Sequence, residues 1–326
     1  MSKSVSIIIR SYNEEEHIER LLEGIFEQSV KNIEVIMVDS GSTDQTLKIA
    51  RTFPVIVHEI KPSEFSFGRA LNLGCQTAIG EFFVIASAHI YPVYKDWLKK
   101  LLIPFDDPKV GAVYGKQRGC DTTKYSEHQI FKKWFPEECN FSQEHPFFNN
   151  ANAAIRSKLW NRVPYDETLT GLEDIDWANR VLKLAYKIAY SEEAEVIHVH
   201  SETITQIFNR YRREAIALKR IFPQEKFSLW DFLRLLTVNS INDIYHSFHE
   251  NVFWKNLADI IAFRMMQFWG TYTGYARRGP ITNQLRQTFY YPNGLSRKLS
   301  QFKPPEFRKR IEYACNRQNG LTKPYN

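Results

Sequence analysis

The sequence has 326 residues, with 43 Lys+Arg against 37 Asp+Glu and a formal net charge of +6. Hydrophobic residues make up 43% and charged residues 25%, ordinary globular values that exclude a disordered chain, a collagen and a coiled coil. The charge is uneven, because residues 201–326 contain 20 Lys+Arg and only 9 Asp+Glu. A basic second half indicates an anionic partner, either a membrane surface or a nucleic acid.

Cysteine usage and the N-terminus predict a cytoplasmic location. The four cysteines are scattered and form no CxxC pair: Cys75, Cys120, Cys139 and Cys315. Residues 1–4 lead directly into a strand-like segment, so we expect no signal peptide. Disulfides are not needed, and a reducing cytosol is the simplest expectation. The longest apolar stretch, residues 251–276, contains three charged residues, so we do not expect it to span a bilayer.

Short β-branched segments alternate with helical patterns through the first 90 residues. The predicted strands are residues 5–9, 33–38, 55–57 and 82–86. The predicted helices cover 18–26, a segment opened by a Ser42–Gln45 capping box, and 69–79. This alternation predicts an α/β fold with a mixed, mainly parallel Rossmann-like sheet flanked by helices. Ligands of such sheets bind at the carboxyl ends of the strands, here residues 11–13, 39–41 and 87–89.

The pattern is less regular after residue 110. A further strand is predicted over 110–114, and the acidic pair Glu173-Asp174 opens a helix. Residues 120–148 are rich in aromatic residues and lack clear periodicity, so we expect a loop that covers the substrate.

The alternation of a predicted strand over 194–200 places His198 and His200 on the same face. Thr203 and Gln206 are expected to cap the helix that follows. From there to residue 276 the pattern is helical and aromatic.

Polar segments follow the first two predicted strands. Tyr12 lies in Ser-Tyr-Asn-Glu (11–14) and Asp39 in Asp-Ser-Gly-Ser-Thr-Asp (39–44). An aromatic ring and a carboxylate at neighbouring strand ends can stack on a nucleotide base and accept hydrogen bonds from its imide or from a ribose hydroxyl. Taken singly, either segment is equally well explained as a turn. There is no GxGxxG after the first strand and no GxxxxGK[ST]. The sequence therefore lacks the main motifs of a dinucleotide-dependent dehydrogenase and of a P-loop NTPase.

The ordered set of motifs resembles the family 2 glycosyltransferases of the GT-A fold, from Val5 to about Ser201. The matching segments are Ser-Ile-Ile-Ile-Arg-Ser-Tyr-Asn-Glu (6–14), Val-Asp-Ser-Gly-Ser-Thr-Asp (38–44), Gly-Arg-Ala-Leu-Asn-Leu-Gly (68–74), Asn-Asn-Ala-Asn-Ala-Ala-Ile-Arg (149–156), Gly-Leu-Glu-Asp-Ile-Asp-Trp (171–177) and Val-Ile-His-Val-His-Ser (196–201). The resemblance implies an inverting enzyme of the bacterial surface-polysaccharide, rhamnosyltransferase-like kind. Such an enzyme moves a hexosyl or pentosyl group from a nucleotide diphosphate sugar to an acceptor hydroxyl.

The resemblance also implies roles for individual residues. The implied donor-binding residues are Ser11, Tyr12, Glu14, Asp39, Arg69, Asn72, Ser87 and His89. The implied acceptor-side residues are Glu173, Trp177 and Asn152. Trp177 is equally well explained as a core residue.

The family places its catalytic base at the second residue of the Glu-Asp pair, which is Asp174 here. This carboxylate would take the proton of the acceptor hydroxyl as the oxygen attacks the anomeric carbon. The alternative is structural, because acidic residues favour a helix N-terminus through the macrodipole.

The chain departs from the family pattern at two places. Arg10 precedes the Ser-Tyr-Asn segment where the family usually has proline, and Ser87-Ala88-His89 replaces the Asp-x-Asp that holds Mg²⁺ or Mn²⁺ against the donor diphosphate. His89 can still ligate a softer ion such as Mn²⁺, together with His198 or His200. Alternatively, His89 and nearby arginines stabilise the diphosphate without metal, or His89 is a loop residue without a catalytic role.

Residues 1–203 are expected to form the GT-A catalytic domain and 204–326 a basic, mostly helical extension. Tryptophans 230, 254 and 269, with interleaved Lys and Arg, suit helices lying on an anionic membrane at the inner face of the cell membrane. A solvated basic face over a helical core explains the same pattern equally well. The expected acceptor is a glycan or lipid-linked glycan of capsule or O-antigen assembly, and no nucleic acid is expected.

Three other functions remain open. A sugar-nucleotide nucleotidyltransferase shares the nucleotide-binding architecture but normally has a Gly-rich N-terminal loop, which is absent here. A nucleic-acid-binding protein would use the basic half and would bind with steeply salt-dependent affinity. A non-catalytic family member is the third, because the carboxylates expected at 87–89 are missing.

Overall fold

The computed structural model describes residues 3–279 and 309–313. Strands and helices alternate through its first part, as the hydrophobic pattern predicts. These elements are β1 (Val5–Ser11), α1 (Ile18–Phe26), β2 (Ile33–Asp39), α2 (Thr46–Ala50), β3 (Ile56–Glu59), α3 (Phe67–Thr77), β4 (Phe82–Ser87), β5 (Ile90–Pro92) and α4 (Trp97–Leu102), with 3-10 turns at Pro62–Glu64 and Ile103–Asp106. The elements that follow are β6 (Val110–Arg118), α5 (Tyr125–Trp134), β7 (Asn140–Gln143), β8 (Asn152–Arg156), α6 (Ser157–Arg162), α7 (Glu173–Lys183), β9 (Lys187–His198), α8 (Ile204–Ile221), α9 (Leu229–His249) and α10 (Phe253–Ala276).

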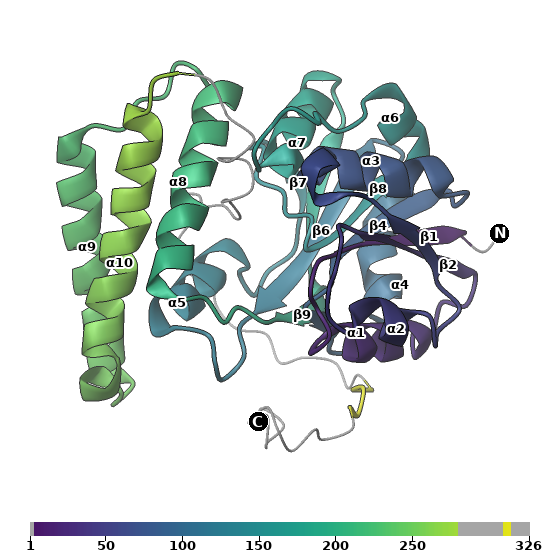
Figure 1. The fold of residues 1–326 in the computed structure, drawn as a ribbon, viewed down its shortest axis with the longest axis horizontal. Helices are drawn as coiled ribbons and strands as arrows, with labels where there is room; N and C mark the ends of the chain where they lie inside the picture. Colours follow the sequence, from purple (N-terminus) through teal and green to yellow (C-terminus); the bar gives the residue numbers. More distant parts are fainter. Residues whose placement is uncertain (1–2, 280–308, 314–326) are drawn as a thin grey trace.

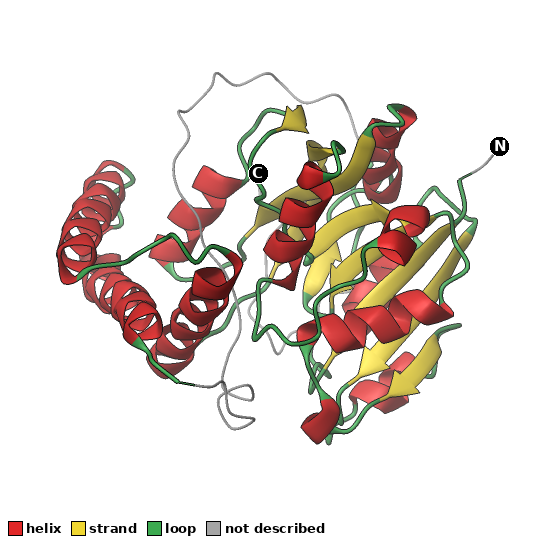
Figure 2. Cartoon of the chain, turned by 90° about the horizontal axis from the view of Figure 1, so that it is seen from above, coloured by secondary structure: helices red, strands yellow, loops and turns green. Residues whose placement is uncertain are grey.

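The strands form one sheet in the order β3-β2-β1-β4-β8-β6-β9-β5, with β7 paired to β9. β1 to β4 are mutually parallel, and β8 pairs antiparallel with both β4 and β6. Because β9 is parallel to β6, the carboxyl ends of β1, β2, β4, β6 and β9 all lie at one edge of the sheet. Helices cover both faces of the sheet (Figure 2). The α/β class predicted from the sequence is confirmed.

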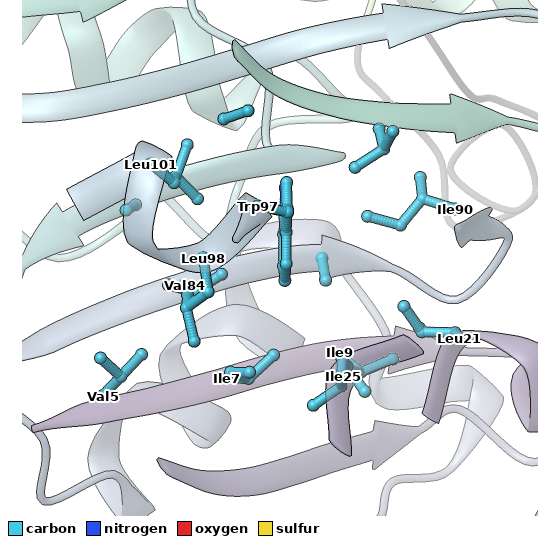
Figure 3. Packing of buried hydrophobic residues seen from close by; sticks show 14 of the residues in the cluster. Val5, Ile7, Ile9, Leu21, Ile25, Val84, Ile90, Trp97, Leu98 and Leu101 are labelled. Atoms are coloured by element: carbon cyan, nitrogen blue, oxygen red, sulfur yellow. The ribbon is translucent and has the colours of Figure 1, made fainter. Parts of the chain in front are cut away.

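Strand β1 shows why the sheet is buried on both faces. Its residues alternate between two cores: Ile7 and Ile9 pack with α1 and α4, whereas Ile8 packs against the opposite layer. Figure 3 shows the first of these cores, in which Trp97 of α4 lies among aliphatic side chains from β1, α1 and β4. A strand that is apolar at successive positions therefore has a packing partner on each side.

Two local predictions are wrong. Ser42 does not cap α2, because its hydroxyl donates to the Asp39 carboxylate at 2.6 Å, and Asp44 accepts from the Thr46 backbone N–H instead. Residues 120–148 are not one long loop, because they contain α5 and β7. Helix α5 has a mixed composition, and the aromatic side chain of Phe131 packs into the core beside β6 and β9.

The helices after β9 form a layer beside the sheet (Figure 1). The predicted capping box is confirmed, with reciprocal hydrogen bonds between Thr203 and Gln206 at the start of α8. Helix α10 lies between α8 and α9, and a Cβ atom at its Gly270 would come within 2.5 Å of the Phe208 carbonyl oxygen of α8. This close approach needs a residue without a side chain. No helix within the described residues is both long enough and apolar enough to cross a membrane.

A buried ion pair joins the last two helices. The Arg264 guanidinium of α10 contacts both carboxylate oxygens of Asp243 in α9 at 2.7 and 2.9 Å, and it also donates to Gln267 at 2.8 Å. Both charged side chains are almost fully buried. Removing one member would therefore leave a desolvated charge without its counter-ion.

We predict that Arg264→Met lowers the free energy of unfolding by about 3–5 kcal/mol, because Asp243 stays buried and uncompensated. Lys132→Met is the matched control, since it breaks an exposed 3.0 Å pair with Glu250 and should change stability by no more than about 1 kcal/mol. Chemical denaturation measures both values. Equal stability of Arg264→Met and the wild type would contradict the prediction.

Candidate active site

The Asp39 carboxylate organises the loop after β2. It is fully buried and accepts hydrogen bonds from the Ser11 hydroxyl at 2.7 Å and from the backbone N–H groups of Gly41 and Ser42 at 2.9 and 2.7 Å. The Ser42 hydroxyl is a fourth donor. Asp39 and Ser11 were predicted to bind the donor, and here they fix the shape of the two strand ends on which a donor would rest.

The turn after β1 carries an exposed aromatic ring. Tyr12 is 54% exposed, and the next residue, Asn13, has a positive φ of 53°. Asparagine tolerates this left-handed conformation better than most residues. Its side-chain oxygen accepts from the backbone N–H of Thr43 at 2.8 Å, so the β1 turn is tied to the loop after β2. Tyr12 is thus available for stacking on a planar ligand.

Arg69 and Asn72 occupy different environments on α3. Arg69 is exposed in the first turn of the helix, whose N-cap is Ser66. Asn72 is buried and its amide is fully engaged, because it donates to the Tyr165 carbonyl and to Glu167 and accepts from Trp160 Nε1 and Tyr165 N–H, all at 2.9–3.0 Å. Arg69 can therefore reach a ligand, whereas Asn72 anchors the segment that leads to α7.

Three histidines meet where β4 and β9 end. His89 stacks on His198 with ring centroids 5.0 Å apart, and His198 Nε2 lies 3.1 Å from His200 Nε2. The Nδ1 atom of His89 contacts Glu14 at 2.8 Å, and its Nε2 contacts the Ser87 hydroxyl at 3.1 Å. The structure therefore brings together the strand-end residues 14, 87 and 89 with both histidines of the Val-Ile-His-Val-His segment.

Two imidazoles of this cluster, His89 and His198, have opposite pKa shifts. Burial tends to lower the pKa of His89, but the Glu14 carboxylate outweighs this effect and raises it. Burial lowers the pKa of His198 well below the ordinary value, and the neighbouring His200 acts in the same direction. His198 is therefore neutral at physiological pH, the form in which an imidazole ligates a metal.

Asp174 lies at the start of α7 and is buried. Its carboxylate accepts from the backbone N–H groups of Asn150 at 3.2 Å and Ile175 at 2.8 Å. Burial, and then the adjacent Glu173 carboxylate, raise its pKa to about 7. Glu173 itself forms an ion pair with Arg10 of β1 at 3.1 Å. An aspartate that titrates near neutral pH can both take and release a proton under physiological conditions.

A strained residue precedes this pair. Leu172 has a positive φ of 58°, which a leucine adopts only where packing enforces it. Its buried side chain packs with Ile175 and with Ala217 of α8. Helix α8 thereby holds the conformation that starts α7 and orients Asp174.

Two of the predicted acceptor-side residues lie in the core. Trp177 is fully buried and its indole N–H donates to the Val163 carbonyl at 2.6 Å, so it cannot form a sugar platform. Asn152 is also fully buried; its amide oxygen accepts from Trp97 Nε1 at 2.9 Å, and its amide nitrogen donates to the carbonyls of Lys116 and Ala194. Both predictions are corrected, because these side chains are used entirely within the fold.

Several residues near the histidines were missed from the sequence. Glu127 of α5 accepts from His200 Nδ1 at 2.8 Å and from Arg210 of α8 at 2.7 Å. Burial alone would raise the pKa of Glu127, but Arg210 and His200 lower it to about 2. Gln117 accepts from His198 Nδ1 at 2.7 Å, and His17 Nδ1 lies 2.5 Å from the Tyr91 hydroxyl. No sequence signal marked them, since each comes from a different element.

The architecture is that of the GT-A glycosyltransferase fold. A mannosyltransferase from Pyrobaculum calidifontis, solved with GDP-Man and Mn2+, superposes with a TM-score of 0.58 at 20% identity, covering 84% of this chain and 85% of that one. TarS 1-349 of S. aureus, solved with UDP-GlcNAc, gives a TM-score of 0.51 at 19% identity, covering 81% and 90% of the two chains. At these identities the likeness shows the fold.

The sequence comparison gives the family. Residues 6–166 match the family described as Glycosyl transferase family 2. The chain therefore contains a family 2 glycosyltransferase domain. The O-antigen chain rhamnosyltransferase RfbN of Salmonella typhimurium is 27% identical over 220 residues, which cover 64% of this chain and 70% of the relative. The O-antigen chain rhamnosyltransferase WbaN of Salmonella anatum is 30% identical over 197 residues, covering 55% of this chain and 60%, less than two thirds, of the relative.

We predict that Glu173→Gln shifts the acidic limb of the pH–rate profile to lower pH. The substitution removes the like charge that raises the pKa of Asp174, and it releases Arg10, whose charge lowers that pKa further. The wild-type kcat/KM should fall as pH drops through about 7, because protonation of Asp174 removes the base. Asp176→Asn is the control, since Asp176 pairs with Arg180 on the same helix. If the acidic limb of the Glu173→Gln profile lies at the same pH as that of the wild type, Glu173 does not set the pKa of Asp174.

Proposed function

We propose that the chain is an inverting glycosyltransferase that moves a hexosyl or pentosyl group from a nucleotide diphosphate sugar to a hydroxyl of a bacterial surface glycan. The observation that carries this proposal is the buried Asp174, whose pKa is raised to near neutrality within a family 2 domain. The rhamnosyltransferase relatives act on O-antigen chains by their names, which supports a surface-glycan acceptor. Capsule and O-antigen units are the acceptor class we propose, either free or lipid-linked.

The reaction we propose is a single in-line displacement. The acceptor oxygen forms a bond to the anomeric carbon as the bond from that carbon to the diphosphate oxygen breaks. The hydroxyl proton passes to Asp174, and the bonding electron pair leaves with the nucleoside diphosphate. Attack on the face opposite the leaving group inverts the anomeric configuration.

The donor would occupy the carboxyl edge of β1, β2 and β4. The exposed Tyr12 ring can stack on the nucleotide base, and the loop held by Asp39 would lie beside the nucleotide. Arg69 is the exposed cation at the start of α3 on this side of the chain. Ser87 and His89, whose side chains are 3.1 Å apart, would lie beside the leaving diphosphate, where positive charge is needed. A divalent cation bound there would neutralise the negative charge that develops on the diphosphate.

Residues 204–279 are proposed as part of an extension that lies on an anionic membrane, at the inner face of the cell membrane; most of the predicted extension after residue 279 lies outside the described residues. Helix α9 lies on the side of the helical layer that faces away from the sheet (Figure 1). The exposed large apolar side chains of α9 and α10 are Leu229, Trp230, Leu233, Val238, Ile241, Tyr245, Phe248, Trp254, Ile261, Met265 and Trp269. Many exposed apolar side chains with tryptophan and tyrosine among them favour insertion at a bilayer interface over a solvated face.

We predict that Asp174→Asn abolishes transfer while the protein stays folded. A general base contributes about 10²–10⁴-fold, so kcat should fall by at least about 10². The folded state raises the pKa of this carboxyl, so its ionisation above pH 7 destabilises the fold. The Asn variant should therefore unfold at an equal or higher temperature at pH 8.

The assay incubates the protein with nucleotide sugars and acceptor glycans, and it follows release of nucleoside diphosphate and the anomeric configuration of the product by NMR. Asp176→Asn serves as the control and should retain near-normal transfer. Full activity of Asp174→Asn would remove it as the base, and a product with retained configuration would exclude the displacement mechanism.

We predict that Trp230→Ala combined with Trp254→Ala weakens binding to vesicles containing anionic lipid. These side chains are 70% and 87% exposed, and each should contribute at least about tenfold to the partition, given about 1.5–3 kcal/mol for burying a large apolar side chain. Ile79→Ala is the control, since Ile79 is 87% exposed and lies between α3 and β4, outside the helices α9 and α10. Vesicle co-sedimentation measures the partition. Wild-type protein that stays in the supernatant would refute the membrane surface.

A further inference from the structure

A short segment near the C-terminus lies along the edge of the sheet. Strand β5 ends the strand order, and residues 309–313 (yellow in Figure 1) run antiparallel to the residues that follow it. The backbone N–H of Lys95 donates to the Lys309 carbonyl at 3.1 Å. The backbone N–H of Ile311 donates in the other direction, to the Val93 carbonyl, also at 3.1 Å. An edge strand presents backbone groups with which a further strand can pair, and here that strand comes from the same chain.

The side chains of this segment alternate between the protein and the solvent. Ile311 is buried, whereas its neighbours Arg310 and Glu312 are exposed. Tyr313, two residues after Ile311, is partly buried, and its hydroxyl donates to the Pro92 carbonyl at 2.6 Å. This alternation is that of a strand with one face packed against the protein.

Helix α1 has the shape that the Tyr313 side chain requires. Gly24 lies inside this helix, where glycine is less favourable than alanine. A Cβ atom at this position would overlap with the Tyr313 hydroxyl. Arg20 is four residues earlier and so on the same face of α1, and its guanidinium lies 5.0 and 5.8 Å from the ring centroids of Tyr91 and Tyr313. The contact therefore depends on particular side chains of α1 as well as on backbone pairing.

Tyr91 connects this contact to the cluster at the strand ends. It is buried in β5, and its ring centroid lies 6.0 Å from that of Tyr313. Its hydroxyl lies 2.5 Å from His17 Nδ1, and the His17 ring meets the His89 ring edge-on, with centroids 6.3 Å apart. A continuous series of side-chain contacts thus leads from Tyr313 to His89.

We propose that residues 309–313 dock on the β5 edge as a strand supplied by this chain, and that they position the donor side of the site, around His89. Tyr313 is the positioning residue, and it acts through Tyr91 and His17. Loss of its side chain removes a neighbour of the Tyr91 ring, so the hydroxyl that orients the His17 imidazole is held less firmly. The effect on the donor rests on the proposed function, but the docking of the segment does not.

The docking is tested on the full chain by limited digestion with trypsin, in which cleavage after Lys309 and Arg310 is followed by mass spectrometry. A protease cleaves this segment when it has left the edge, so the cleavage rate reports undocking. Tyr313→Ala should raise the rate at least about tenfold, because burial of an aromatic ring is lost. Tyr245→Ala, which removes an exposed tyrosine of α9, should leave it unchanged. Circular dichroism checks that both variants fold. Equal rates for the wild type and Tyr313→Ala would overturn the proposal.

Gly24→Ala tests the same contact from the side of α1. The added methyl group should raise the cleavage rate, because it overlaps with the Tyr313 hydroxyl. In a Tyr313→Phe background the overlapping atom is gone, and the nearest ring atom of residue 313 lies 3.4 Å from the added carbon. Gly24→Ala should therefore leave the rate of that background almost unchanged. Equal acceleration in both backgrounds would overturn the contact between α1 and Tyr313.

Sugar transfer by Tyr313→Ala tests the effect on the donor. We expect the KM for the nucleotide sugar to rise at least about threefold while kcat stays within about twofold. The acidic limb of the pH–rate profile depends on Asp174 and should stay in place, and Tyr313→Phe, which keeps the ring beside Tyr91, should keep most of the wild-type KM. An unchanged KM in a Tyr313→Ala protein whose segment undocks would overturn the positioning role. A docked segment in a protein that transfers no sugar from any nucleotide sugar would instead refute the proposed function and leave the docking standing.

Discussion

The constraint on which the site depends is a buried carboxylate next to a second carboxylate. Asp174 and Glu173 begin α7 in surroundings with little water, where adjacent negative charges repel strongly. Arg10 compensates one of them through its ion pair with Glu173, and two backbone N–H groups donate to the other. Helix α8 holds Leu172 in its left-handed conformation and so fixes the orientation of the first turn of α7, which carries Glu173 and Asp174. The result is an aspartate that exchanges a proton near neutral pH.

The topology of the sheet explains how distant segments reach this place. The reversed strand β8 lies between β4 and β6, so that β6 and β9 point in the same direction as β1 and β4. His198 at the end of β9 can therefore stack on His89 after β4, although the four strands β5 to β8 and the four helices α4 to α7 separate them in the sequence. The charge of Arg10 acts to lower the pKa of both His89 and Asp174, and so it links the two ends of the candidate site.

Much of the fold was predictable because its strands are apolar on both faces and its helices have clear stripes. The shared face of His198 and His200 also followed from strand alternation. The capping role of Ser42 was not predictable, because Asp39 competes for the same hydroxyl through a contact between loop and strand end. Helix α5 was missed since its polar residue Glu127 bonds to His200, just after β9, and to Arg210 of α8, and a local pattern does not reveal such partners. A motif likewise does not show whether a side chain such as Trp177 is buried and hydrogen-bonded within the core.

We propose that the carboxyl edge of the sheet binds a nucleotide sugar whether or not Asp174 can accept a proton. Isothermal titration calorimetry with nucleoside diphosphates and their sugar conjugates, in the presence of Mg²⁺, Mn²⁺ or Zn²⁺, is the measurement to make first. We expect one nucleotide to bind the wild type with one-to-one stoichiometry, Asp174→Asn to bind it with the same affinity, and Tyr12→Ala to bind it more weakly. If no nucleotide binds with any of these ions, the strand ends are not a donor site.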